Sequence, residues 1–199
     1  MNAFFEKWNE ELEDLKIHLS LGEEELAEAF DKQKARFQVY ADQLKQKLDE
    51  AGVDDALTSL RAKVEELQVQ LALGKADSRD ALEAQRHQLH KAVREAGEIT
   101  QQLAAQAGEA SQSWLKEFEE ASSRFQTRLE VLKVQAALGE AELKDKWEES
   151  RRELDGFIHE AREKMSEVQE DTSEKLEEVS REVAASYEKI KAKVRGFFA

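Results

Sequence analysis

The chain has 199 residues, of which 37% are charged and 40% are hydrophobic, and its formal net charge is -14. So polar a composition leaves too little apolar material for a thick core, and the acidic excess argues against nucleic acid as a partner because affinity for phosphates comes largely from Lys and Arg. The lack of proline and the wealth of Ala, Leu, Glu, Gln, Lys and Arg predict an all-α fold.

The first predicted element is a helix over about 2–51. Its apolar or small residues recur at alternating steps of three and four, which is typical of a seam facing a partner helix. An extra step of four then leads to Phe30 and turns a seven-residue spacing into one of eleven, which locally unwinds a supercoil. The seam residues before this step are Phe5, Trp8, Leu12, Leu15, Leu19, Gly22 and Leu26.

Gly52 and the acids after it predict a turn, because glycine suits a helix C-cap and Asp caps the next helix. We expect further helices over about 54–106 and 110–155, separated near Gly97 or Gly108. Residues 157–196 either continue the third helix or form a fourth. Short connections make neighbours antiparallel, so we predict one elongated domain over 1–199, an antiparallel bundle or coiled coil of three to four long helices.

Three similar stretches form a predicted internal repeat: LKIHLSLGEEELAEAF at 15–30, LQVQLALGKADSRDAL at 67–82 and LKVQAALGEAELKDKW at 132–147. Each copy contains a glycine, at Gly22, Gly74 and Gly139. As C-caps these glycines would end short helices, and the acids after them would suit the next helix start. As seam residues they would lie inside long helices and let a facing helix approach. We favour the seam, because the three-four pattern crosses each glycine in phase.

A polar residue lies eleven positions after each glycine, at Gln33, Gln85 and Ser150. Buried polar residues in a helix seam can fix register and oligomer state at some cost in stability. The alternative is that these three side chains lie at a solvated edge. The sequence favours neither interpretation.

The two ends of the chain carry the residues that suit a membrane or partner contact. The C-terminal EKIKAKVRGFFA is basic, amphipathic and aromatic, as in segments that lie on anionic membranes. The alternative is that its cations favour a helix C-terminus while its aromatic rings pack on the bundle. The residues concerned at the two ends are Phe4, Phe5, Trp8, Lys189, Lys191, Lys193, Arg195, Phe197 and Phe198.

The sequence carries no motif from which we assign a catalytic, cofactor-binding or metal-binding residue, so we expect a protein that is not an enzyme. No histidine has a glutamate three residues before it, as di-iron bundles require. His87 and His90 could share a helix face, but Arg86 and Lys91 beside them favour solvated surface. Absence of cysteine, of a recognisable export signal and of a long apolar run predicts a cytoplasmic protein.

The stretches LQVQLALGKADSRDALE and LKVQAALGEAELKDKWEE resemble segments of poorly characterised bacterial coiled-coil proteins, including small stress-response proteins. That resemblance implies a cytoplasmic helical protein without a known active site. The leading hypothesis is a non-enzymatic scaffold, associated with stress, that binds itself or another helical protein through its seams. The alternative is a peripheral membrane-binding or membrane-remodelling protein that uses the basic aromatic C-terminus.

Overall fold

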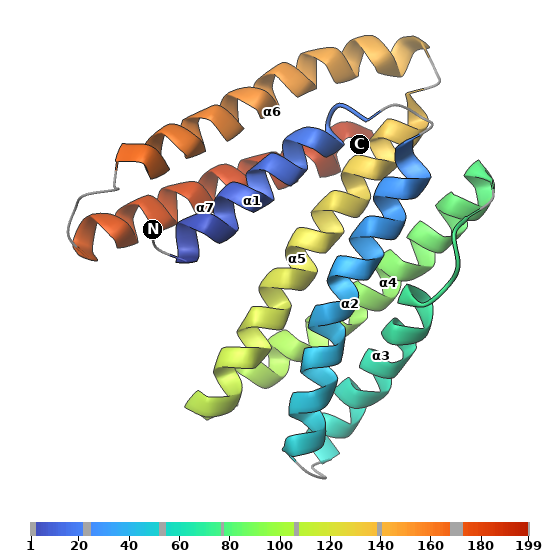
Figure 1. Cartoon of the computed structure of the whole chain (residues 1–199), viewed down its shortest axis with the longest axis vertical. Coiled ribbons are helices and arrows are strands. Elements are labelled where there is room, and N and C mark those ends of the chain that lie inside the picture. Colours follow the sequence, from blue (N-terminus) through green and yellow to red (C-terminus); the bar gives the residue numbers. More distant parts are fainter. Residues whose placement is uncertain are drawn as a thin grey trace. The chain divides into compact units, whose positions relative to one another are not determined.

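The computed structural model describes residues 3–21, 25–51, 55–76, 78–105, 108–138, 141–167 and 173–198, and every regular element within them is a helix (Figure 1). This confirms the predicted all-α class. The helices are α1 (Ala3–His18), α2 (Leu26–Glu50), α3 (Asp55–Leu71), α4 (Arg79–Ala104), α5 (Glu109–Ala137), α6 (Ala141–Glu167), α7 (Ser173–Arg195) and the short 3-10 helix η2 (Gly196–Phe198).

Contacts between residues divide the chain into two compact units. Unit 1 comprises Met1–Glu23 with Glu130–Ala199, and unit 2 comprises Glu24–Leu129. Helix α5 contributes its first part to unit 2 and its last part to unit 1. A single domain over 1–199 stays a prediction.

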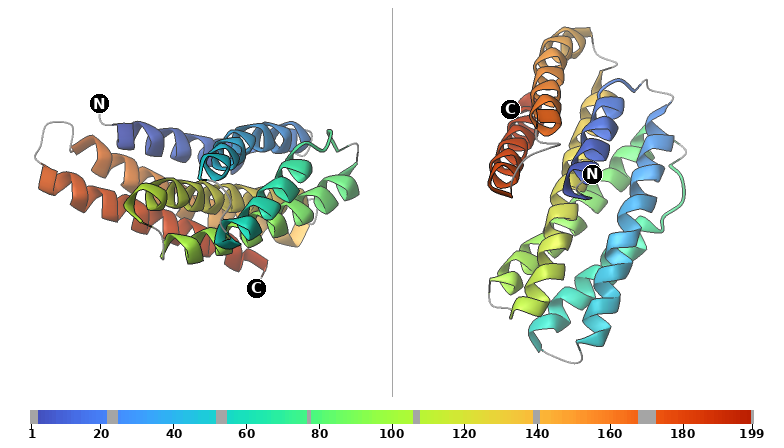
Figure 2. Two further views of the ribbon diagram at one scale, coloured as in Figure 1. Left: turned by 90° about the horizontal axis from the view of Figure 1, so that it is seen from below. Right: turned by 60° about the vertical axis from the view of Figure 1, so that its left-hand side comes forward.

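Unit 2 joins α2, α3, α4 and the first part of α5 into an antiparallel set of four helices (Figures 1 and 2). Helix α3 contacts both α2 and α4. Helix α5 closes the set, because the rings of Phe37 and Phe125 stack at 4.4 Å and Gly97 of α4 faces Ser122 of α5. Apolar residues recur on one face of each helix, so the core lies between the four. The largest fully buried side chains here are Phe30, Phe125, Leu48, Leu60, Leu67, Leu89, Leu115 and Leu129.

Unit 1 packs α1, the end of α5, α6 and α7 around a second core. Helices α6 and α7 are antiparallel, since Lys164 pairs with Glu182 at 3.0 Å while Lys193 pairs with Glu153 at 2.7 Å. Helix α1 adds one seam of leucines to this core. The core residues are Leu12, Leu15, Leu19, Val131, Val134, Trp147, Leu154, Ile158, Ala161, Met165, Val179, Val183, Tyr187, Ile190, Val194 and Phe197.

The helices are shorter than the sequence predicts, because the chain leaves helical structure within each copy of the repeated stretch. The first copy contains the end of α1 and the start of α2, the second links α3 to α4, and the third links α5 to α6. Continuous helices over about 2–51, 54–106 and 110–155 are therefore wrong. Gly22 and Gly139 lie outside the described residues. Gly74 is described, exposed and not helical, so its placement inside a helix seam is also wrong.

Local hydrogen bonding explains why the chain breaks around Gly74. Ser78 has an extended backbone, and its hydroxyl accepts a hydrogen bond from the Ala81 N–H at 3.2 Å, so Ser78 is the N-cap of α4. Asp80 then places a negative charge in the first turn, where the helix dipole favours it. A continuous helix would forgo this cap and place Gly74 in its interior, which costs about 1 kcal/mol relative to alanine.

The other predicted breaks have mixed outcomes. A break beside Gly52 is confirmed, since α2 ends at Glu50 and α3 begins at Asp55. The second falls beside Gly108, whereas Gly97 lies within α4. Gly156 lies inside α6, which runs on to Glu167, so a helix boundary at 155 to 157 is wrong. The last helix, α7, is separate from α6 and folds back along it.

Candidate functional site

A buried lysine, Lys34, organises the polar contacts at the junction between α3 and α4. Only 4% of this residue is exposed. Its ammonium donates to the carbonyl oxygen of Leu73 at 2.7 Å and lies 2.8 Å from the Asp31 carboxylate. The Lys34 Nζ also lies 5.1 Å from the centre of the Phe30 ring. Burying an ammonium is costly unless it is paired and hydrogen-bonded, and here it is both.

The polar residues that follow the three glycines are buried at two of the three positions. Gln33 is buried, and its Oε1 accepts from Arg128 Nη1 of α5 at 2.6 Å. Gln85 is half-buried, and its Nε2 donates to the carbonyl of Gly74 at 3.2 Å, beside Lys34. Ser150 is buried in unit 1. Gln33 thus links α2 to α5, whereas Gln85 contacts the junction between α3 and α4.

Sequence reasoning missed Lys34, although the repeat contained a signal for it. Arg86 lies as far beyond Gly74 as Lys34 lies beyond Gly22. Both side chains are buried, and each pairs with an acid three residues earlier, Lys34 with Asp31 and Arg86 with Glu83 at 2.6 Å. The first two copies of the repeated stretch therefore share a buried basic residue next to the seam and an acidic residue one turn before it.

Side chains from other helices or turns satisfy the carbonyl oxygens at several helix ends. Such carbonyls have no partner within their own helix, so a Lys, Arg or Gln donor stabilises the helix end. The hydrogen bonds join Gln135 to Leu19 at 2.8 Å, Arg61 to Leu48 at 2.6 Å, Lys34 to Leu73 at 2.7 Å, Gln112 to Ala104 at 3.4 Å and Lys146 to Phe197 at 2.8 Å.

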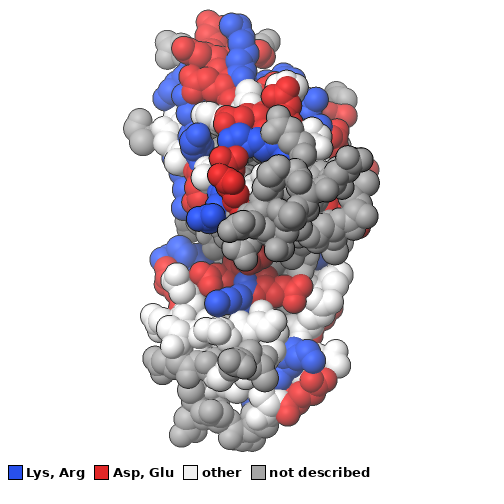
Figure 3. Space-filling view, turned by 90° about the vertical axis from the view of Figure 1, so that its left-hand side faces the viewer, with Lys and Arg blue, Asp and Glu red and all other residues white. Residues whose placement is uncertain are grey.

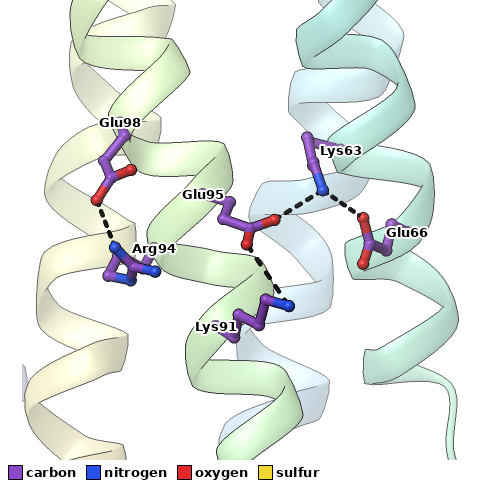
Figure 4. A network of polar contacts seen from close by, with 6 residues as sticks. All are labelled: Lys63, Glu66, Lys91, Arg94, Glu95 and Glu98. Carbon is purple, nitrogen blue, oxygen red and sulfur yellow. Dashed lines mark hydrogen bonds and ion pairs between the residues drawn. The ribbon is translucent and has the colours of Figure 1, made fainter.

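A network of charged side chains joins α3 to α4 (Figure 4). Lys63 donates to Glu66 at 2.8 Å and, across the helix interface, to Glu95 at 2.7 Å. The hydrogen bonds that Lys63 donates to Glu66 and Glu95 raise the pKa of Lys63, and the one to Glu95 lowers the pKa of Glu95. Arg94 pairs with Glu98 at 2.9 Å within α4. Acidic and basic side chains are likewise interspersed over the coloured part of the face in Figure 3.

The described residues of the basic C-terminus make contacts within unit 1. Phe197 is buried and packs edge-on against Trp147, with ring centroids 5.5 Å apart. Lys191 pairs with Glu188 at 2.6 Å, and Lys193 pairs with Glu153 of α6. The Lys189 ammonium lies 5.5 Å from the centre of the Phe157 ring.

Of the remaining terminal residues, Arg195 is exposed and Trp8 is half-buried. The Trp8 ring meets Tyr187 of α7 edge-on at 5.3 Å. The side chains of Phe4, Phe5 and Phe198 lie outside the described residues. The structure therefore places the described aromatic rings of both ends against unit 1, the packing that was the alternative to a membrane contact.

Three of the exposed apolar side chains lie on α2 or on and just after α3 of unit 2, and another, Ile17 of α1 in unit 1, is 50% exposed. Val39 is 54% exposed, Val69 is 62% exposed and Leu73, just after α3, is 41% exposed. Val39 lies one turn before Asp42, which accepts from Gln68 of α3 at 2.6 Å. Val69 lies one turn after Glu65, which pairs with Lys45 of α2 at 3.6 Å. We call Val39, Val69 and Leu73 the α2–α3 apolar face.

Comparison with protein-family models, with curated protein sequences and with solved structures finds no match to this chain. Across the described residues, no helix combines the length and apolar character needed to cross a bilayer. Within the same residues, no three His, Cys, Asp or Glu side chains gather as ligands for a metal ion. His87 is exposed and His90 is half-buried.

Proposed function

We propose that this protein is a non-enzymatic helical scaffold that associates with a second copy of itself. The observation that carries the proposal is the α2–α3 apolar face, where three large side chains stay exposed on adjoining helices. Exposed apolar residues are common singly, whereas a group on one face is typical of an interaction surface.

The packing changes which residues we propose for this association. The sequence assigns it to the seams, but most described seam residues are buried within the two units, including Leu12, Phe37 and Leu60. A side chain already buried in the folded chain adds no apolar area to an interface. The exposed residues Val39, Val69 and Leu73 are therefore the ones we propose to make contact.

Sedimentation velocity tests this proposal over concentrations from about 1 to 100 µM, the range in which weak dimers dissociate. We expect the wild-type chain to shift from monomer to dimer, and the double variant Val39→Lys/Val69→Lys to stay monomeric. A matched control, Gln101→Lys/Gln102→Lys, adds the same charge at exposed positions of α4 and should dimerise as the wild type does. A wild-type chain that is monomeric throughout would contradict the proposal.

The alternative function, peripheral binding to an anionic membrane, has less support. Phe197 is buried against Trp147, and Lys193 pairs with Glu153 rather than facing solvent alone. Membrane insertion of Phe197 would require loss of its apolar contacts in unit 1. Flotation with anionic vesicles tests this alternative, and we expect the protein to stay with the unbound fraction.

A further inference from the structure

A pocket of about 240 Å³ lies between α2 and α5 within unit 2. Its lining residues fall at positions three or four apart on each helix, so one face of α2 and one face of α5 meet across it. They are Tyr40, Gln43, Leu44 and Lys47 of α2 with Trp114, Glu117 and Phe118 of α5.

Aromatic and apolar groups form the walls and floor of this pocket. Phe118 and Leu44 are buried, whereas Tyr40 and Trp114 are half-buried, so part of each of these two side chains faces solvent. Phe37 packs behind the wall, its ring centroid 6.4 Å from that of Tyr40 and 5.8 Å from that of Phe118. The Tyr40 and Phe118 rings are therefore held in place before any ligand binds.

Two charged residues, Glu117 and Lys47, line the pocket. Glu117 is exposed, and no ion pair or hydrogen bond joins it to another residue in the described part of the chain. The ammonium of Lys47, the other charged lining residue, pairs with Glu50 one turn further along α2 at 3.1 Å. A ligand that enters beside the rings thus meets the Glu117 carboxylate.

We propose that this pocket binds a small organic cation through its quaternary ammonium group. Aromatic faces attract cations, and aromatic cages are a recurrent means of recognising quaternary ammonium ligands. A cation with N–H donors would leave those donors unsatisfied against Phe118 and Leu44, whereas a trimethylammonium group presents only methyl groups to them. Glu117 neutralises its charge.

Titration of the Trp114 indole N–H signal by NMR tests the proposal on the full-length chain. Trp8 and Trp147, the other two tryptophans, serve as internal controls because they lie in unit 1. With choline chloride we expect a saturable shift of the Trp114 signal in the millimolar range. Its neutral analogue 3,3-dimethylbutan-1-ol, which has the same shape without the charge, should bind at least about 5-fold more weakly.

Two variants test the proposed contacts. Tyr40→Leu removes an aromatic wall and should weaken choline binding about 10-fold. Glu117→Gln removes only the charge of an exposed side chain and should weaken it about 5-fold, whereas Glu120→Gln on the same helix should not.

Three results would overturn the proposal. They are a Trp114 shift that matching sodium chloride reproduces, equal binding of the neutral analogue, and unchanged affinity in Glu117→Gln. Phosphatidylcholine vesicles distinguish the source of the cation. Binding to vesicles without binding to free choline would also overturn the assignment to a small cation.

Discussion

Lys34 shows how a single buried side chain holds a helix junction in place. Its ammonium contacts the carbonyl oxygens of Leu73 and Gly74, at 2.7 and 3.4 Å, where α3 has already ended. The Asp31 carboxylate supplies the opposite charge from the same helix as Lys34. The chain can leave the helix here because these carbonyls gain a charged donor in place of a helical N–H.

Replacing Lys34 with methionine should therefore lower the free energy of unfolding by about 2 kcal/mol, because it leaves the Leu73 carbonyl without its donor. Methionine has a similar length, so the change removes the charge and the hydrogen bonds more than the packing. Lys32→Met, at an exposed position of the same helix, is the matched control and should change stability by less than about 0.5 kcal/mol. Urea unfolding measures both. Equal effects of the two variants would refute the role given to Lys34.

Glu95 should make stability depend on pH, since its hydrogen bond with Lys63 holds its pKa below the ordinary value of 4.5. Its ionised form is favoured by folding, so its contribution is present above the unfolded-state pKa and is lost as pH falls through the lower folded-state pKa. Between about pH 5 and pH 3, the Glu95→Gln variant should therefore lose less stability than the wild type. Urea unfolding at each pH measures this difference.

Glu98→Gln is the control for the Glu95 experiment. Glu98 pairs with Arg94 inside α4 and does not take part in the ion pair between Lys63 and Glu95. This variant should keep the bridge and its pH dependence. The same slope in Glu95→Gln as in the wild type would show that the bridge between α3 and α4 adds no pH-dependent stability.

At the scale of the helices, the sequence pattern predicts which residues are buried better than where each helix ends. Leu26, Phe30, Phe37, Leu44 and Leu48 all follow the three-four pattern, and all are buried. The pattern reports burial against a neighbour, and two helices joined by a short turn can bury the same face without being continuous. A three-four pattern that continues in phase across a glycine therefore does not show that the helix is continuous there.

The start of α4 is set by a local signal, whereas the contact that satisfies the end of α3 depends on packing. The three-four spacing places Ser78 at a seam position, yet its hydroxyl caps α4. The donor that satisfies the other side of the junction, Lys34, lies far along the chain from Leu73. No local pattern predicts that contact, because it depends on how α2 packs against α3.

A proline at Arg79 distinguishes a helix start from a helix interior. Arg79 is the first residue of α4, where proline is favoured, and Ser78 before it has the extended backbone that proline requires. Arg79→Pro should change the free energy of unfolding by less than about 1 kcal/mol, whereas Gln88→Pro inside α4 should cost about 3 kcal/mol or more. Thermal unfolding compares the two. A loss for Arg79→Pro as large as that for Gln88→Pro would argue for a continuous helix.

At the scale of the whole molecule, the seams close within the chain. Unit 2 buries its apolar stripes among α2, α3, α4 and part of α5, and unit 1 buries its own among α1, α6, α7 and the end of α5. The class of fold follows from composition, because the chain has no proline and is rich in helix-forming residues, and little supports strands. The α2–α3 apolar face and the pocket beside Trp114 depend on which helices adjoin, so they become visible only in three dimensions.

Amide hydrogen exchange across residues 60–100 tests whether the repeated stretch is a junction between two packed helices. Amides are protected when they are hydrogen-bonded and buried, so exchange maps helix boundaries residue by residue. We predict rapid exchange at Gly74, Lys75 and Ala76, between strong protection around Leu67 and around Leu89. Protection that continues without a break from Leu60 to Thr100 would contradict it.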